Sequence, residues 1–415
     1  MIIGGGPAGA KAADELKKLD PEGSIILISD ENYAFYKRSN IINLISNSCT
    51  EDDLFLKGKD FYTNIGVQFL FNHVSKVVPE KNQISLDDDS IINYDSLLIA
   101  TGGKPIVIPW EGINLQGIFT LYTLDDAKKV ARLVCNAKNA VIIGGGSIAM
   151  KAVQNFNKIG LNISIIEKAS HLWPIGFDRK AAKIIEDRIK EAGINIYLNA
   201  EVIRFKSNEG KVCSVILKNQ KEIPADIVII TIGIKPNVEF LKGSNILINN
   251  GIYVDKYLRT NIPNIYAAGD IALTYDPLYK TQILHPTWGN AKKQGKIAAK
   301  NMTGKHVEYD GTIPIQSIKA FEYRAIVAGI THSKYTYDEI SLVSFQKGSV
   351  RKFVINKGNL IGVLLLGKNL DKKKLKPIIK KAVYNNVNVE EFENELLNEN
   401  FNLEKLIENI QTGKK

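Results

Sequence analysis

The apolar and polar positions of the chain follow the same order twice. The segment MIIGGGPAGAKAADELKKL and the following SIILISDE contain a short apolar run, a glycine-rich turn, an amphipathic stretch and a second apolar run. The order recurs from Ala140, in AVIIGGGSIAMKAVQNFNKIG and then NISIIEK. Each segment predicts a βαβ unit, whose right-handed crossover makes the two strands parallel. The sequence therefore predicts an α/β fold with two Rossmann-like domains.

The remaining segments indicate how the chain is divided. An apolar strand, YDSLLIATG, precedes a Pro/Gly-rich stretch with PWEG, which indicates a linker near residue 106. A second boundary near residue 246 follows the apolar segment ADIVIITIGIKPN. From about Tyr335, three β-like runs and then Lys/Glu/Asn-rich helical segments indicate an α+β module. We predict a first domain of residues 1–106 and 247–330, an inserted domain of residues 107–246 and a C-terminal α+β domain of residues 331–415.

The first turn has the spacing Gly4-x-Gly6-x-x-Gly9. Such glycines permit a tight turn, let the backbone approach a pyrophosphate and let the helix pack closely on the strand. The helix N-terminus then faces the phosphates. Asp30 and Glu31 close the next strand. One of them is expected to accept hydrogen bonds from an adenosine ribose, and the other is then a solvated turn acid.

The second turn, Gly144-x-Gly146-x-x-Ala149, has alanine in the third position, which pushes helix and strand slightly apart but permits nucleotide binding. Glu167 closes the following strand. A carboxylate there binds the 2′-hydroxyl of NAD and repels the 2′-phosphate of NADP, so we expect NADH to be preferred. Lys168 either softens this discrimination or is an exposed turn lysine.

Composition and charge limit the class of protein. Hydrophobic residues make up 45% and charged residues 24%, without an apolar run long enough to cross a bilayer. The net charge of +10 is spread along amphipathic segments, which favours an acidic protein partner over nucleic acid. Cys49, Cys135 and Cys213 lie far apart, so neither a disulfide framework nor a metal site is expected.

The N-terminus carries no signal-peptide pattern, so a cytoplasmic location is expected. Only Met1, Ile2 and Ile3 precede Gly4. A buried parallel strand usually runs for about five or six residues. We therefore expect a few residues to be missing before Met1.

Six segments occur in a characteristic order: GGGPAG, YDSLLIATG, VIIGGG, ADIVIITIGIKPN, NIYAAGD and WGNAKKQGKIAAKNMTG. In these segments the chain resembles the FAD-dependent pyridine-nucleotide oxidoreductases of the disulfide type, in the branch of rubredoxin reductases and NADH nitrite reductase flavoproteins. The resemblance covers nearly the whole chain. It implies a glutathione-reductase-like fold in which the first domain binds FAD and the inserted domain binds NAD. The C-terminal domain then resembles the interface domain of the family, which often builds a homodimer.

The resemblance also implies the cofactor-binding residues. Those expected at FAD are Gly4, Gly6, Pro7, Ala8, Gly9, Asp30, Glu31, Arg38, Ala100, Thr101, Gly102, Gly269, Asp270 and Trp288. Those expected at NAD are Gly144, Gly146, Ala149, Glu167 and Gly233. Arg38 would neutralise FAD phosphate charge or lie on the surface. Asp270 would bind the ribityl or pyrophosphate region or cap a helix, and Trp288 would lie beside the isoalloxazine.

The chain departs from the family at two places. Ser39 occupies the position of the redox cysteine of the disulfide- and peroxide-reducing members, which excludes thiol chemistry there. Asn43 and Lys151 occupy positions where related branches pair a lysine with a glutamate near the nicotinamide.

These features predict an oxidoreductase that passes electrons from NADH through FAD to a rubredoxin- or ferredoxin-like protein or an iron–sulfur subunit. The alternatives are an NADH oxidase, or a flavoprotein subunit of a larger redox complex with mainly a docking role. No catalytic acid or base is nominated, because positioning and the cofactors supply the chemistry. Among the scattered histidines, including His332, only His285 lies close in sequence to an expected flavin contact.

Overall fold

The computed structural model describes residues 1–331 and 338–411. Internal contacts divide the chain into two units. Unit 1 comprises Met1–Asn40, Cys49–Lys104 and Ile234–Thr312, and unit 2 comprises Ile41–Ser48, Pro105–Gly233 and the described residues from Ile313 onward. None of the helices in the described ranges has the length and apolar character that crossing a membrane requires.

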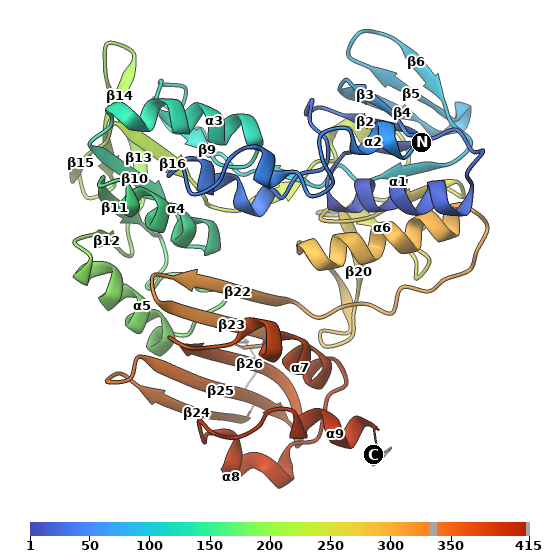
Figure 1. Cartoon of the computed structure of the whole chain (residues 1–415). Coiled ribbons are helices and arrows are strands. Elements are labelled where there is room, and N and C mark those ends of the chain that lie inside the picture. Colours follow the sequence, from blue (N-terminus) through green and yellow to red (C-terminus); the bar gives the residue numbers. More distant parts are fainter. Residues whose placement is uncertain (332–337, 412–415) are drawn as a thin grey trace. The chain divides into compact units, whose positions relative to one another are not determined.

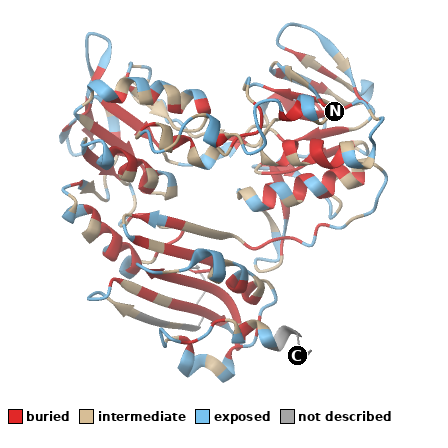
Figure 2. Ribbon diagram, in the orientation of Figure 1, coloured by how far each residue is buried: buried red, intermediate tan, exposed pale blue. Residues whose placement is uncertain are grey.

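Unit 1 is built on a five-stranded parallel sheet with the order β19-β7-β1-β2-β3 (Figure 1). Its inner strands are apolar or nearly so, because a parallel sheet with both faces covered buries the side chains on both sides; the edge strand β3 is partly exposed. Figure 2 shows most residues of its central strands as buried. The strands are β1 (Ile2–Ile3), β2 (Ile26–Ser29), β3 (Gln68–Phe71), β7 (Leu97–Ile99) and β19 (Ile265–Ala267).

Two helices of unit 1 pack against each other, α1 (Pro7–Leu19) and α6 (Trp288–Met302). Small residues permit this approach: a Cβ on Gly295 of α6 would lie 2.1 Å from the carbonyl oxygen of Ala8 in α1. The position of α6 therefore depends on the backbone of α1, which directly follows the first glycine-rich turn.

Smaller elements complete unit 1. One three-stranded antiparallel sheet contains β4 (Val74–Val78), β5 (Gln83–Leu86) and β6 (Ile91–Asn93). A second sheet contains β18 (Ile252–Tyr253), β20 (Ala272–Asp276) and β21 (Thr281–Leu284). The strands β8 (Gly103–Pro105) and β17 (Ile234–Pro236) pair with each other, and α2 (Phe61–Asn64) forms one helical turn.

Unit 2 contains a second five-stranded parallel sheet with the order β12-β11-β10-β16-β9. Its strands are β9 (Ile118–Thr120), β10 (Asn139–Ile143), β11 (Asn162–Ile166), β12 (Asn195–Tyr197) and β16 (Ile227–Ile230). Its helices are α3 (Leu124–Leu133), α4 (Ser147–Lys158) and α5 (Arg179–Glu191), and an antiparallel sheet is formed by β13 (Val202–Asn208), β14 (Lys211–Leu217) and β15 (Glu222–Pro224). The two predicted Rossmann-like folds are thus confirmed.

The C-terminal part of unit 2 is a five-stranded antiparallel sheet with the order β22-β23-β26-β25-β24. Its strands are β22 (Ile315–Ala320), β23 (Tyr323–Gly329), β24 (Asp338–Ser344), β25 (Ser349–Asn356) and β26 (Asn359–Gly367). The helices α7 (Lys372–Tyr384), α8 (Glu393–Leu396) and α9 (Lys405–Gln411) complete this module. A predicted C-terminal α+β fold is therefore present.

The start of this module differs from the prediction. The sequence predicts that residues up to 330 belong to the first domain, yet β22 pairs with β23 and β23 pairs with β26, so both strands are part of the C-terminal sheet. The sequence alone does not assign these two strands to the C-terminal sheet, because they follow α6 directly in the chain and no linker pattern separates them from it. Strand pairing over about 40 residues is a long-range property that local periodicity does not report.

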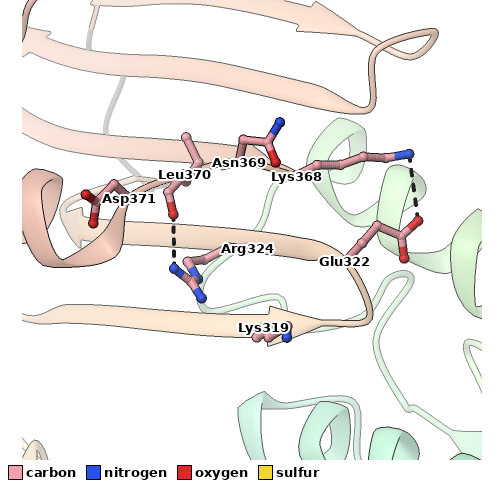
Figure 3. Close-up of a pocket in the computed structure, with 7 residues that line it drawn as sticks. All are labelled: Lys319, Glu322, Arg324, Lys368, Asn369, Leu370 and Asp371. Atoms are coloured by element: carbon pink, nitrogen blue, oxygen red, sulfur yellow. Dashed lines mark hydrogen bonds and ion pairs between the residues drawn. The ribbon is translucent and has the colours of Figure 1, made fainter.

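A groove of about 400 Å³ lies on this module between the end of β22, the β22–β23 turn and the segment before α7 (Figure 3). Arg324 donates a hydrogen bond of 3.1 Å to the carbonyl of Leu370, and Lys368 pairs with Glu322 at 3.8 Å. Three cations and two carboxylates line this groove: Lys319, Arg324, Lys368, Glu322 and Asp371.

Candidate dinucleotide-binding sites

The glycine-rich turn of unit 1 requires glycine for steric reasons. Gly4 has φ of +107°, and a Cβ there would lie 2.3 Å from the carbonyl oxygen of Ala100. A Cβ on Gly9 would lie 1.9 Å from the carbonyl oxygen of Gly4. By contrast, no atom lies within 4 Å of a Cβ built on Gly6, immediately before Pro7 and Ala8 open α1. The turn therefore leaves open space at the helix N-terminus, where a phosphate group is stabilised.

The turn of unit 2 repeats this geometry. Gly144 has φ of +101°, and its Cβ would lie 2.6 Å from the carbonyl oxygen of Thr231. Gly146 precedes α4 with φ −79° and ψ −171°, against −72° and −171° for Gly6. A Cβ on Gly146 also meets nothing within 4 Å, although Ala149 replaces the third glycine and is fully buried. Each unit thus has an open space of the same backbone geometry at a helix N-terminus, where a phosphate could be held.

The structure distinguishes the two acids after β2. The Glu31 side chain is only 16% exposed, accepts a hydrogen bond of 2.5 Å from the Tyr36 hydroxyl and pairs with Arg38. Asp30 is exposed. The half-buried Glu31 is therefore better placed for a ribose, and Arg38 lies beside it.

Glu167 occupies the equivalent position at the end of β11. Its Oε2 accepts a hydrogen bond of 2.6 Å from the backbone N–H of Gly145, and its Oε1 accepts one of 2.8 Å from the N–H of Ala169. These bonds hold the carboxylate against the glycine-rich turn. A carboxylate offers about four acceptor sites, so capacity remains for ribose hydroxyls.

The segments after β7 and β16 place further candidates at the same sheet edges. Ala100 donates to the carbonyl of Ile3 at 2.8 Å, and the Thr101 hydroxyl donates to the carbonyl of Asn237 at 3.0 Å. Gly102 and Gly233 have φ of +64° and +117°, which favour glycine. In unit 2, the bond equivalent to that of Ala100 runs from the N–H of Thr231 to the carbonyl of Ile143, at 2.8 Å.

Gly269 and Asp270 follow β19 in unit 1. Gly269, with φ of +88°, donates its N–H to Oε1 of the buried Gln294 in α6 at 2.7 Å. Burial raises the pKa of Asp270 to about 6, while the charge of Arg38 acts in the opposite direction. A carboxyl group that is costly to ionise in the protein alone is suited to a ligand that donates hydrogen bonds to it.

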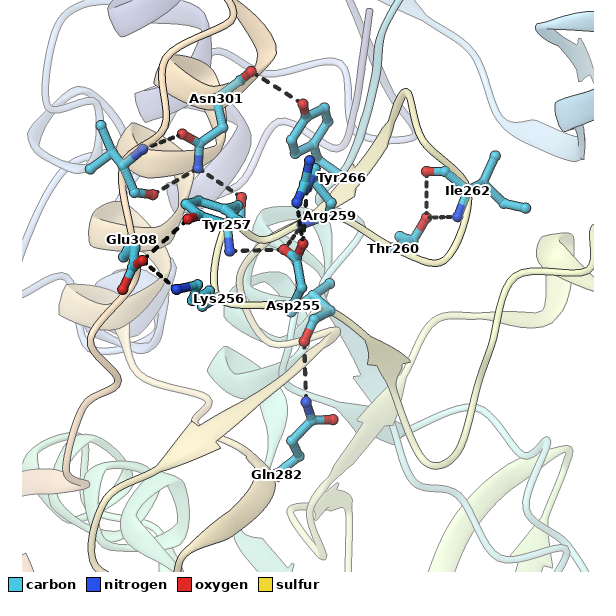
Figure 4. Close-up of polar contacts among 12 residues, drawn as sticks. Asp255, Lys256, Tyr257, Arg259, Thr260, Ile262, Tyr266, Gln282, Asn301 and Glu308 are labelled. Atoms are coloured by element: carbon cyan, nitrogen blue, oxygen red, sulfur yellow. Dashed lines mark hydrogen bonds and ion pairs between the residues drawn. The ribbon is translucent and has the colours of Figure 1, made fainter.

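Helix α6 is anchored at both ends. At its N-terminus, Trp288 stacks on Phe35 with ring centroids 5.2 Å apart and an interplanar angle of 21°. At its C-terminal end, Asn301 donates to the carbonyls of Tyr257 and Val307 at 2.8 and 2.9 Å (Figure 4). The Asn301 carbonyl accepts a bond of 3.1 Å from the Tyr266 hydroxyl of β19. These contacts fix the direction in which the N-terminal end of the helix dipole points.

The sequence analysis missed several polar residues that support these sites. Gln294 lies in the segment WGNAKKQGKIAAKNMTG, directly before Gly295. A polar residue at this place among small apolar residues was the signal that could have identified it. Tyr62 donates from its hydroxyl to the carbonyl of Gly5 at 3.1 Å, and burial raises its pKa. No local signal pointed to Tyr62, because it is 57 residues from its partner.

Other singled-out residues lie elsewhere. Ser39 is exposed, and Asn43 and Lys151 both belong to unit 2. His285 is buried with its Nε2 2.9 Å from Oδ2 of Asp276, an ion-pair separation without the orientation of a hydrogen bond. His332 lies outside the described residues.

The residues present fit FAD and NAD. Each unit has a positive-φ glycine, an open cradle at a helix N-terminus and a half-buried glutamate at the end of the next strand. In unit 1, Gly269 and Asp270 also follow β19, at the carboxyl end of the parallel sheet.

Comparison with known proteins agrees with this geometry. Residues 1–295 match the family described as pyridine nucleotide-disulphide oxidoreductase. Among curated relatives, the chain is 25% identical over 378 residues to the assimilatory nitrate reductase electron transfer subunit of Bacillus subtilis (strain 168), covering 90% of this chain and 48% of that protein. It is 29% identical over 306 residues to the rubredoxin-NAD(+) reductase of Pseudomonas putida, covering 73% of this chain and 80% of that protein.

A solved structure, the NAD-dependent persulfide reductase from A. fulgidus, is similar with a TM-score of 0.89 and 25% sequence identity, covering 99% of this chain and 83% of that one. The chain thus spans about half the length of the first of these curated relatives and most of the second.

Proposed function

Because the chain belongs to the pyridine nucleotide-disulphide oxidoreductase family and is therefore an oxidoreductase with FAD and NADH as cofactors, we propose that it oxidises NADH and delivers the electrons to an acidic electron-transfer protein. The carrier would be of the rubredoxin or ferredoxin kind, or an iron–sulfur subunit. The observation that carries this proposal is the pair of equivalent phosphate cradles, each with a strand-end glutamate. FAD, when bound, accepts a hydride from NADH and returns electrons singly.

We assign the FAD to unit 1 and the NADH to unit 2. In unit 1, the N-terminus of α1 would hold the pyrophosphate of FAD, and Glu31 would bind the ribose. Asp270 would accept a hydrogen bond from a hydroxyl group of the cofactor. In unit 2, α4 and Glu167 would hold the equivalent parts of NADH. Trp288, at the start of α6, would shield one side of the flavin from water.

The position of Ser39 limits where the electrons go. A serine hydroxyl cannot form the disulfide or sulfenic acid on which the thiol-dependent members of the family rely. Ser39 donates to the side chain of Asn40 at 3.3 Å. The electrons therefore leave from the flavin itself, which favours an external one-electron carrier.

The charge of the C-terminal module favours an acidic carrier. Residues 368–381 contain seven lysines and one aspartate, a net charge of +6 out of +10 for the chain. Lys372 and Lys373 lie in the first turn of α7, where cations oppose the helix dipole. Burial and the charges of Lys372 and Lys380 lower the pKa of Lys376. An acidic surface beside α7 and the neighbouring groove would relieve this repulsion.

The first test is anaerobic mixing of the FAD-loaded protein with NADH, and separately with NADPH, while flavin absorbance is followed by stopped flow. Fast bleaching by NADH supports the proposal. Slow bleaching by both nucleotides overturns it and favours a flavoprotein subunit that a partner reduces. A second test offers rubredoxin, a [2Fe–2S] ferredoxin or oxygen as the acceptor. Fast turnover with oxygen alone would indicate an NADH oxidase instead.

The acidic-carrier part is tested with the double variant Lys372→Glu and Lys373→Glu. We expect the KM for the carrier to rise about tenfold at low salt, while the rate of flavin bleaching by NADH stays unchanged. The double variant Lys180→Glu and Lys211→Glu, at two exposed lysines of the nucleotide-binding part of unit 2, is the control with the same charge change. An equal effect of both pairs would show that net charge, and not α7, governs the encounter.

The length of one relative supports a second candidate function. The nitrate reductase electron transfer subunit is about twice as long as the part that matches this chain. The chain would then be the NADH-oxidising component of a larger redox assembly. Co-purification of the natural protein with an iron–sulfur partner, measured by size-exclusion chromatography, tests this candidate.

A further inference from the structure

Lys168 directly follows the proposed ribose-binding Glu167 at the end of β11. Its side chain is 79% exposed. In Rossmann-like sites a cation near this position accommodates the 2′-phosphate of NADP. Taken alone, Lys168 would therefore weaken the preference for NADH that Glu167 creates.

A second acid neutralises this lysine. Oε1 of Glu201 lies 3.1 Å from Nζ of Lys168, and Oε2 lies 3.9 Å from Nζ of Lys218. The hydrogen bond to Lys168 and the charges of both lysines hold the pKa of Glu201 below its usual value. Glu201 is thus charged at neutral pH and lies between two cations.

The backbone fixes Glu201 beside the nucleotide-binding strand. Ala200 donates its N–H to the carbonyl of Glu167 at 3.0 Å, and Asn199 donates to the carbonyl of Ala169 at 3.0 Å. On the other side, Lys218 donates its N–H to the carbonyl of Glu201 at 2.8 Å. These bonds lie beyond the last β11–β12 pair, Ile166 with Tyr197, and hold the backbone on both sides of Glu201 close to Glu167 and Lys168.

We propose that Glu201 is a specificity-determining residue, which holds Lys168 and Lys218 away from a 2′-phosphate and so maintains the preference for NADH over NADPH. The inference rests on the proposed role of Glu167 at the ribose. Glu167 repels the phosphate directly, and Glu201 removes the cations that would otherwise attract it. The two acids therefore act on the same discrimination by separate routes.

The expected effect is moderate, because exposed ion pairs are weak and screened by salt. We expect Glu201→Gln to tighten the binding of a 2′-phosphate-bearing ligand about fivefold at low ionic strength. A ligand without the 2′-phosphate should bind with unchanged affinity. The gain should shrink as salt is added.

The experiment is calorimetric titration of the purified full chain with adenosine 2′,5′-bisphosphate and, separately, with 5′-AMP. Neither probe requires turnover, so the readout does not depend on the flavin. The matched control is Glu222→Gln in the same part of unit 2. It breaks an ion pair in which Oε2 of Glu222 lies 2.5 Å from Nζ of Lys206. Lys168→Ala combined with Glu201→Gln tests whether the gain acts through Lys168.

A fivefold gain for the bisphosphate alone, absent in Glu222→Gln and reduced by Lys168→Ala, supports the inference. An unchanged bisphosphate affinity in Glu201→Gln, or equal gains for both probes or both variants, overturns it. A wrong assignment of the ribose site to Glu167 would give a different result from a wrong role of Glu201. In that case 5′-AMP would not bind the wild-type protein, or its affinity would not change in Glu167→Gln. Unchanged 5′-AMP affinity in Glu201→Gln also shows that the variant is folded.

Discussion

Replacement of Gly295 by alanine should separate α1 from α6 and weaken the FAD-binding unit. The added Cβ would lie 2.1 Å from the carbonyl oxygen of Ala8 and 2.8 Å from its carbonyl carbon, whereas ordinary contact begins near 3.4 Å. The clashing atoms belong to the backbone, so no side-chain rotation relieves the overlap. The helices must therefore move apart, and Ala8 lies directly after the first residue of α1.

The magnitude follows from two opposing effects. Overpacking of this kind costs about 1–3 kcal/mol, while alanine in place of glycine within a helix gains about 1 kcal/mol. We expect a net destabilisation of up to about 2 kcal/mol, or as much as roughly 8 °C in Tm for a domain of this size. FAD should also bind more weakly, because the cradle at α1 is displaced.

Gly289 provides the matched control, since it lies in the same helix, is exposed and has no atom within 4 Å of its Cβ. Gly289→Ala should leave the Tm of the FAD-free protein unchanged or raise it slightly. The assay is thermal unfolding of both variants without FAD, followed by fluorescence titration with FAD. Equal Tm values for the two variants would refute the steric reasoning.

Three further predictions concern charged residues. Burial raises the pKa of Asp270 to about 6 from 3.8, so the folded apoprotein binds this proton more tightly and loses up to about 3 kcal/mol of stability as the pH rises from about 4 to 6; Asp270→Asn should abolish that loss in melting curves of the FAD-free protein, and an unchanged pH profile would contradict the assignment. Glu167→Gln should weaken NADH binding about tenfold through loss of a charged acceptor, measured by titration, and should affect NADPH less. Arg179→Ala should lower the stability of unit 2 by about 1–3 kcal/mol, because the buried Glu186 would lose its ion pair with the half-exposed Arg179 and keep the hydrogen bond from the N–H of Leu172. Lys183→Ala, which breaks an exposed pair of the same helix, should cost under about 1 kcal/mol by the same melting assay.

Much of the fold could be predicted because its signals are local. Apolar runs on either side of an amphipathic segment specify strand and helix, and the crossover rule then specifies parallel pairing. Both parallel sheets follow these expectations. The extent of the last sheet could not be predicted, since the pairing of β23 with β26 joins residues far apart in sequence.

The candidate sites could also be predicted only in part from the sequence. The spacing of Gly4, Gly6 and Gly9 by itself indicated where the turn and the helix N-terminus lie, because a tight turn at this spacing needs residues without a Cβ. The contact that excludes a Cβ at Gly4 comes from Ala100, and only the tertiary structure shows it. The sequence also determined, through Ser39, that no thiol chemistry occurs at that position.

Only the tertiary structure decided which charged groups act together. It distinguished Glu31 from Asp30 by burial and by the hydroxyl of Tyr36. It also brought Glu201 to Lys168, although 32 residues separate them in the chain. Electrostatic interactions depend on distance and solvent exposure in the folded state, and neither quantity is encoded in local spacing.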